Sequence, residues 1–222
     1  INAGTQAVID GTIVTNSGLI GTSNGNGISI TGTLNLVVST TLDTHDASDP
    51  AGGGPVTLTG LVSARSTGLG LVIDAGSTAP GQSGGDITLD AVGSGPAYVA
   101  GLTARTGGPA GPGRLILRNR ILLDGSPTTG ASFVFDPGSK GGPGTVLVRA
   151  DSVIDTEQGG DGPAGDILLG GTTVASATAV ITTDAVGIDL ALVTEGTASG
   201  RVAFGDVDNS RSEEHTSELQ SP

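Results

Sequence analysis

The feature that most constrains this sequence is a glycine or proline that recurs at near-regular intervals, each time directly before a short aliphatic run. In the first part of the chain the spacings are 28, 30, 28 and 31 residues, between Gly27, Pro55, Gly85, Gly113 and Gly144. The later spacings shorten to 21, 22 and 13 residues, between Gly144, Gly165, Gly187 and Gly200. Repetition on this scale is typical of solenoids, in which each unit buries its apolar face against its neighbours.

Each run shows the alternation of a β-strand with one buried face. Successive side chains of a strand point to opposite faces, so aliphatic residues two positions apart share a face. The predicted inward pairs are Val56/Leu58, Leu71/Ile73, Ile87/Leu89, Leu115/Leu117, Val146/Val148, Ile167/Leu169, Ile188/Leu190 and Val202/Phe204. In four runs a third aliphatic residue falls on the outer face, which predicts that a loop or a second sheet covers Val72, Ile116, Leu147 and Leu168.

The composition narrows the fold to a thin aliphatic core. Glycine accounts for 40 of 222 residues but follows no triplet rhythm, which excludes collagen. The hydrophobic fraction of 36% argues against a disordered chain, and the aromatic fraction of 2% suits stacked layers of small aliphatic side chains. We therefore predict an all-β parallel β-helix, with a repetitive antiparallel β-sandwich array as the alternative.

The last twelve residues differ from the rest of the chain. They contain Glu213, Glu214 and Glu218, whereas residues 1–210 contain only Glu157 and Glu195. The string RSEEHTSELQS resembles a translated sequencing adapter. We therefore treat 1–210 as a fragment of a β-strand repeat domain from a longer chain, and 211–222 as a non-native, disordered tail.

Three segments carry a family resemblance. GGDITLDA at 84–91, GPGTVLVRADSVIDT at 142–156 and AGDILLGG at 164–171 resemble filamentous-haemagglutinin-type adhesins and related bacterial β-strand-repeat exoproteins. The resemblance covers roughly residues 50–205 by pattern. It implies a right-handed parallel β-helix, exported to the bacterial cell surface, that serves as a structural or adhesive stalk.

The charge balance limits the classes of partner that this chain can bind. With nine Lys and Arg and a net charge of −13, the chain lacks the basic clusters that bind nucleic acid. It also has no apolar run of about 18 residues, so we expect no membrane insertion of this segment. The expected partners are host or environmental glycans, surface proteins, and further copies of the chain that associate through open solenoid ends.

Catalytic signatures are sparse. There is no cysteine, and His45, in an acidic loop, is the only histidine outside the tail. We predict no catalysis. The alternative is a pectin-lyase-like, polysaccharide-active β-helix enzyme, which would use carboxylates such as Asp74, Asp86, Asp90, Asp151 and Asp155.

Calcium is the one cofactor that the sequence suggests. Asp206, Asp208 and Ser210 place oxygen ligands at alternate positions, as at the start of a Ca²⁺-binding loop, although an acidic turn has the same pattern. A second candidate metal site combines His45 with Asp43, Asp46 and Asp49.

Overall fold

A computed structural model of the chain describes residues 2–3, 7–9, 13–15, 19–22, 26–45, 52–94, 97–125, 131–138, 142–158 and 162–207. Every ladder between the named strands of these ranges is parallel. The only antiparallel pairings among them are isolated bridges at Ala97. The chain is therefore a parallel β-helix, and the alternative of an antiparallel β-sandwich array is wrong.

The strands are short and follow one another without a long helix. They are β1 (Asn2–Ala3), β2 (Ala7–Ile9), β3 (Ile13–Thr15), β4 (Leu19–Thr22), β5 (Ile28–Ile30), β6 (Leu34–Leu36), β7 (Thr40–Asp43), β8 (Val56–Ala64), β9 (Gly70–Asp74), β10 (Ile87–Val92), β11 (Gly101–Arg105), β12 (Arg114–Leu117), β13 (Ile121–Leu122), β14 (Ala131–Asp136), β15 (Thr145–Val148), β16 (Ser152–Asp155), β17 (Asp166–Leu169), β18 (Val180–Thr183), β19 (Leu190–Val193), β20 (Val202–Ala203) and β21 (Asp206–Val207). No helix in the described ranges has the length and apolarity needed to cross a membrane.

The strands form three faces that the chain visits in a fixed order. The first face contains β2, β5, the start of β8, the start of β10, β12, β15, β18 and β21. The second face contains β3, β6, the ends of β8 and β10, β13, β16 and β19. The third face contains β1, β4, β7, β9, β11, β14, β17 and β20.

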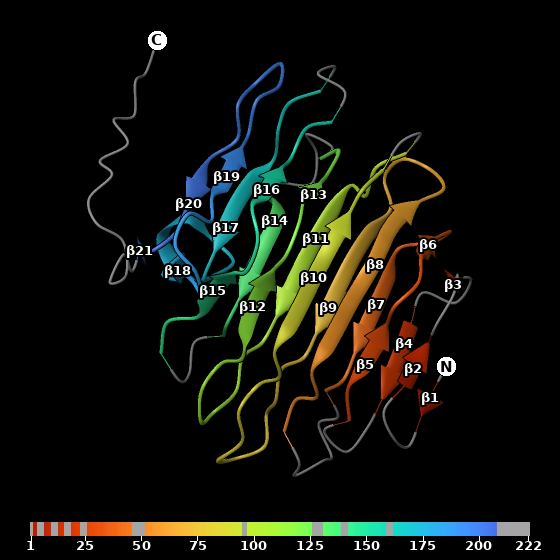
Figure 1. Cartoon of the computed structure of the whole chain (residues 1–222), viewed down its shortest axis with the longest axis vertical. Helices are drawn as coiled ribbons and strands as arrows, with labels where there is room; N and C mark the ends of the chain where they lie inside the picture. Colours follow the sequence, from red (N-terminus) through yellow and green to blue (C-terminus); the bar gives the residue numbers. More distant parts are fainter. Residues whose placement is uncertain are drawn as a thin grey trace.

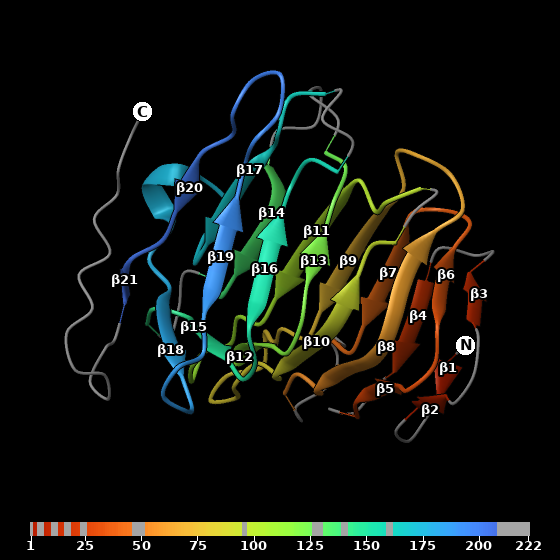
Figure 2. The ribbon, with the colours of Figure 1, turned by 45° about the horizontal axis from the view of Figure 1, so that its top comes forward.

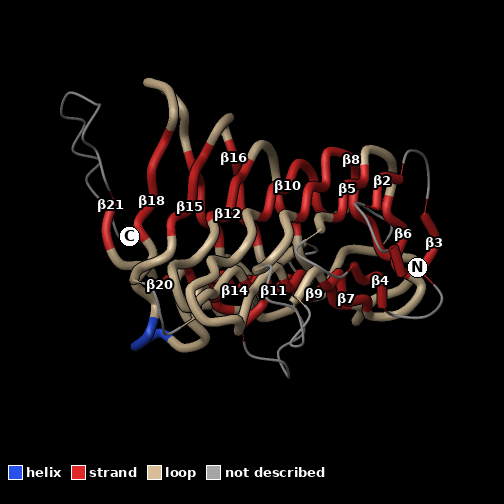
Figure 3. Tube along the Cα trace, turned by 90° about the horizontal axis from the view of Figure 1, so that it is seen from below, coloured by secondary structure: helices blue, strands red, loops and turns tan. Residues whose placement is uncertain are grey.

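The pictures show this stacking directly. The strands advance from the N-terminal end of the molecule to the C-terminal end in sequence order (Figure 1). The second face lies in front of the third in Figure 2, and the first and third faces form two separate rows in Figure 3. A residue therefore lies next to its counterpart one coil later, because the sheets run along the solenoid axis.

The three faces explain the spacing of the glycine and proline signals. The strands of one face, β5, β8, β10, β12 and β15, follow Gly27, Pro55, Gly85, Gly113 and Gly144, with Asp86 between Gly85 and β10. The shorter spacings after Gly144 arise because Gly165, Gly187 and Gly200 lead into strands of the third and second faces. The coils therefore continue after Gly144, where the spacing between these glycines shortens.

The core is a column of mostly aliphatic side chains between the faces, with Phe133 and Phe135 as its largest buried members. Six of the eight predicted inward pairs are buried, from Val56/Leu58 through Ile167/Leu169. Ile188 and Leu190 are partly buried against this core. The prediction that Val202 and Phe204 are buried is wrong: they are 38% and 40% exposed, although Val202 pairs in register with buried Ile167.

Outer-face aliphatic residues are covered in the C-terminal coils. Leu168 packs with Ala177, Ala203 and Val134 in a small second cluster outside the main core. Ala177 directly follows the 3₁₀ helix η1 (Val174–Ser176), which begins with a capping box between Thr173 and Ser176. Ile116 and Leu147 are buried as well, while Val72 is half-buried.

Buried threonines fasten the corners between faces. The hydroxyls of Thr44 and Thr106 donate to the carbonyls of Gly54 and Gly113, at 2.7 and 3.0 Å, across loops that lead from the third face to the first. Thr156 makes the same bond to Gly165 at 2.8 Å, where the second face leads to the third. Because a buried polar group without a partner is costly, these bonds hold the loop bases beside the sheets.

Candidate functional site: a polar groove along the third face

Four residues at the ends of successive third-face strands lie in one row. Asp43, Asp74, Arg105 and Asp136 end β7, β9, β11 and β14. The ladder pairs Asp43 with Asp74, Asp74 with Arg105, and Arg105 with Asp136, each partner 31 residues further on. Adjacent strands lie about 4.8 Å apart, so the row follows the solenoid axis. We call these four residues the acid–arginine row.

Each aspartate of the row also shapes the turn that follows its strand. The Oδ1 atom of Asp43 accepts the backbone N–H of His45 at 2.8 Å. The same bond joins Asp74 to Gly76 at 3.0 Å and Asp136 to Gly138 at 2.9 Å. These are Asx turns, in which the carboxylate takes the place of a backbone acceptor and fixes the chain direction. Arg105 has no acceptor atom and cannot make this bond.

The turns border a groove. A cavity of about 340 Å³, within the range of small-molecule sites, is lined by Asp74, Arg105 and Asp136 of the row together with His45, Ser77, Thr78, Pro109 and four glycines. A neighbouring cavity of about 570 Å³ shares Asp136 and Gly138 and continues to Thr172, Ser176 and Thr178. We call the two together the axial groove, because its lining comes from successive coils.

Glycines line the groove at positions where a side chain would be crowded or where the backbone conformation disfavours other residues. A Cβ atom on Gly107 would lie 3.0 Å from the carbonyl oxygen of Pro137, and Gly138 has a φ of 73°, which disfavours other residues. His45 occupies the corresponding position one coil before Gly76 and carries a ring, whose Nε2 lies 3.1 Å from the Thr78 hydroxyl. His45 is thus half-buried in the groove lining and not free in a solvated loop.

Arg105 differs from the other arginines that form ion pairs. Its guanidinium lies 3.7 Å from the Asp74 carboxylate, beyond hydrogen-bond distance, and the side chain is 49% exposed. Arg114 by contrast binds Asp86 at 2.6 Å, and Arg201 binds Asp166 at 2.7 Å. Arg114 and Arg201 therefore fasten one coil to the next by short ion pairs, whereas Arg105 makes a longer one and lines the groove.

The ion pairs of Arg114 and Arg201 lower the pKa values of their aspartates. Burial works to raise the pKa of Asp86, but the hydrogen bonds and charge of Arg114 outweigh it, so the pKa of Asp86 lies below its ordinary value. Hydrogen bonding to Arg201 lowers the pKa of Asp166, against an opposing effect of burial. In both pairs the aspartate also accepts the backbone N–H of its arginine at 2.8 Å.

The carboxylates expected for an enzyme do not converge. Of the five carboxylates that the sequence suggested for an enzyme, Asp74 alone lines the axial groove. Asp86 and Asp90 belong to the first face, while Asp151 and Asp155 border the second-face strand β16. Asp151 accepts the N–H of Asp189 at 3.1 Å, and Asp155 accepts that of Glu157 at 3.1 Å, so both organise backbone. Sequence reasoning missed Arg105 and Asp136, although the 31-residue spacing would have revealed them.

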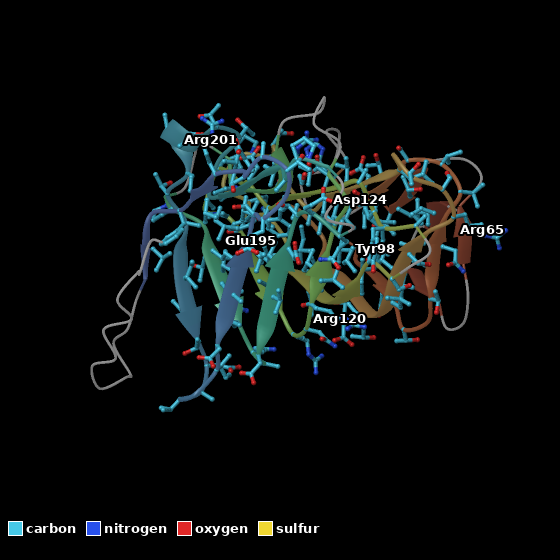
Figure 4. The ribbon with its side chains drawn as sticks, turned by 90° about the horizontal axis from the view of Figure 1, so that it is seen from above. Arg65, Tyr98, Arg120, Asp124, Glu195 and Arg201 are labelled. Atoms are coloured by element: carbon cyan, nitrogen blue, oxygen red, sulfur yellow. The ribbon has the colours of Figure 1, made fainter. Side chains whose placement is uncertain are left out.

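A second row of acids lies at the end of the second face. Continuing the register of β13, β16 and β19 by two residues places Asp124, Glu157 and Glu195 on successive coils. Glu157 is only 6% exposed, and its Oε1 accepts the N–H of Gly162 at 3.4 Å. Asp124 and Glu195 lie well away from Arg120, which precedes β13 at the other end of this face (Figure 4).

Most residues of the two candidate metal sites lie outside the described residues. Asp206 begins β21, which pairs with β18, while Asp208 and Ser210 lie outside the described residues. Asp46 and Asp49 of the His45 cluster also lie outside them. Within the described ranges, no group of three or more His, Asp or Glu side chains is arranged to hold a metal ion. The calcium loop at 206–210 stays a prediction.

Comparison of the chain with protein-family models, with curated proteins and with solved structures finds no match.

Proposed function

We propose that this chain is a structural and adhesive segment of a secreted bacterial surface protein of the filamentous-haemagglutinin type, and that it has no catalytic role. In this proposal the solenoid is a stalk, and the axial groove is the place where it binds glycans. The parallel β-helix, the repeated coils and the resemblance at 84–91, 142–156 and 164–171 support a stalk. Net charge and the scarcity of Lys and Arg favour glycans over nucleic acid as partners.

One observation carries the glycan-binding part of the proposal. The acid–arginine row sets acceptors and a donor at regular steps of about 4.8 Å along the groove. Asx turns hold Asp74 and Asp136 in place before any ligand arrives. A preorganised surface loses little conformational entropy on binding. A polymer of hydroxyl-bearing units matches such a surface because sugar hydroxyls both donate and accept hydrogen bonds.

The test is direct binding of the full chain to a panel of immobilised neutral and acidic polysaccharides, followed by biolayer interferometry. We expect saturable binding to at least one polysaccharide, with competition by the soluble form of the same polymer. Chain unfolded by heat serves as the control and should not bind. Failure of the folded chain to bind any member of a broad panel would refute the adhesive function.

A second function is favoured by one feature of the groove. Asp74 and Asp136 are two ladder steps apart, which places their backbones about 9.6 Å from each other. Inverting glycosidases hold their two carboxyl groups about 6.5–9.5 Å apart. The backbone separation lies just above the upper end of this range, so a polysaccharide hydrolase would use these two residues with their carboxyl groups inclined toward each other. Release of reducing ends by the folded chain, abolished by Asp136→Asn, would establish this function and overturn the non-catalytic proposal.

A further inference from the structure

We infer that the axial groove takes a linear, neutral oligosaccharide lying along the solenoid axis, and that Arg105 is the residue that determines its specificity. The inference rests on the glycan-binding function proposed above and deepens it. It follows from three observations: a break in a repeated motif, the charge of the row, and the length of the groove.

Arg105 breaks a motif that the neighbouring coils keep. At the other three positions of the row an aspartate forms an Asx turn with the residue two positions later. The β11 strand lacks this turn, but it stays in register with β9 at all five of its residues and with β14 at four of them. Where a local rule is broken without a gain in packing, a functional reason is the expected one. Within the described residues, the ion pair of Arg105 with Asp74 spans 3.7 Å, and Arg105 lines the groove.

The charge of the row selects a neutral ligand. One guanidinium stands among the carboxylates of Asp43, Asp74 and Asp136, on a chain with a net charge of −13. A polyuronate or sulfated polymer would be repelled by these carboxylates. A neutral sugar suits them, because its hydroxyls can donate to the aspartates and accept from Arg105.

The length of the groove calls for an oligomer. From His45 through Gly76, Gly107 and Gly138 to Gly170 the lining advances by four coils, a distance of about 19 Å. The two cavities meet at Asp136, and the far one is lined by the hydroxyl-bearing residues Thr172, Ser176 and Thr178. A disaccharide therefore contacts one cavity, and a longer oligomer contacts both.

The experiment is isothermal titration calorimetry of the full chain with soluble β-linked glucose, xylose and mannose oligomers and with galacturonate oligomers, each from disaccharide to hexasaccharide. We expect the neutral series that binds to gain affinity with length, and galacturonate to bind at least roughly tenfold more weakly. Arg105→Asn should weaken the neutral hexasaccharide by at least about tenfold. Asparagine can make the missing Asx turn with Gly107, so the melting curve should be retained.

The control variant is Arg118→Asn, which removes an exposed arginine directly after β12, outside both cavities, and should leave binding unchanged. Galacturonate binding as tightly as every neutral series would overturn the inference, as would unchanged neutral-sugar binding by Arg105→Asn. If Arg105→Asn still binds neutral sugars as wild type does, the specificity role of Arg105 is refuted but the proposed glycan-binding function is not. Absence of binding to every series, together with a negative polysaccharide panel, removes the function as well.

Discussion

The third-face strands β17 and β20 have nearly the same sequence design and very different surroundings. Gly165-Asp166-Ile167 and Gly200-Arg201-Val202 both place a glycine, a charged residue and an inward aliphatic residue in order. Ile167 and Val202 are ladder partners, yet Ile167 is fully buried and Val202 is 38% exposed. The strand pattern sets which way a side chain points, and the coils stacked on both sides determine whether it is buried.

The comparison of β17 with β20 predicts that the same substitution costs much more stability at position 167 than at position 202. Ile167→Asp would bury an unpaired carboxylate between coils and should cost on the order of 4 kcal/mol or more, which unfolds the neighbouring coils. Val202→Asp, one ladder step away, should cost about 1 kcal/mol, because water reaches that position. Urea titrations followed by far-ultraviolet circular dichroism measure both, since the chain has no Trp and one Tyr. Equal losses of stability would show that burial at the two positions does not differ as described.

The corner threonines allow a finer version of the same comparison. Thr156 is fully buried and bonds Gly165 at 2.8 Å, while Thr194, its neighbour on the next coil, is partly exposed and bonds Gly200 at 3.1 Å. Thr156→Val should cost about 1–3 kcal/mol, because the Gly165 carbonyl loses a buried donor. Thr194→Val should cost less than about 1 kcal/mol, because water can replace the hydroxyl. The same urea titrations test this, and an effect of Thr194→Val as large as that of Thr156→Val would contradict it.

Sequence alone predicts the strands and most of the core because both depend on local patterns. The alternation in runs such as Ile87–Leu89 fixes which side chains face inward, and the glycine before each strand marks where the coil turns. The alternation says nothing about position in the stack, which is why the burial of Val202 and Phe204 was predicted wrongly. It also does not assign strands to faces, so the spacings after Gly144 seemed irregular.

The groove was harder to predict because its residues are separated in sequence. Asp74 was proposed as a carboxylate of interest, but its neighbours Arg105 and Asp136 come from other coils. The constant 31-residue step that relates Asp43, Asp74, Arg105 and Asp136 holds only on the third face. On the first face, the spacing between ladder partners alternates between 28 and 31 residues from β5 to β15, which hides this period. Loops of variable length between faces account for the difference.

The exposed inward residues of the C-terminal coil predict self-association of the chain. Val202 and Phe204 are large apolar side chains that are 38% and 40% exposed, and exposed apolar side chains favour contact with a second copy. Net negative charge opposes this, and salt screens the repulsion beyond about 8 Å at physiological strength, so association should increase with salt. Phe204→Ser should shift the distribution toward monomer in sedimentation velocity runs at high salt. Val38→Ser, which changes a residue of similar exposure far from this coil, is the control and should leave association unchanged.

The ion pairs of Asp86 with Arg114 and of Asp166 with Arg201 give the smallest expected effect on stability, and this effect depends on pH. The folded-state pKa of Asp86 lies below its ordinary value. Its ion pair with Arg114 therefore contributes stability above that ordinary value, and the contribution is lost as pH falls through the lowered folded-state pKa. Asp86→Asn keeps an acceptor for the Arg114 backbone N–H, and it removes the charge together with the Oδ2 acceptor of the Arg114 guanidinium. At about pH 7 it should cost about 1 kcal/mol or less, since both side chains are substantially solvent-exposed. Below the lowered pKa, the free energies of unfolding of wild type and variant should converge.

A double-mutant cycle with Arg114→Gln, measured by urea titration at neutral and acidic pH, isolates the coupling energy of the pair. The pair of Asp166 with Arg201 should follow the same direction with a smaller coupling, because the Arg201 side chain is 70% exposed. A coupling energy at Asp86 that stays constant into acid would show that the lowered pKa does not come from Arg114.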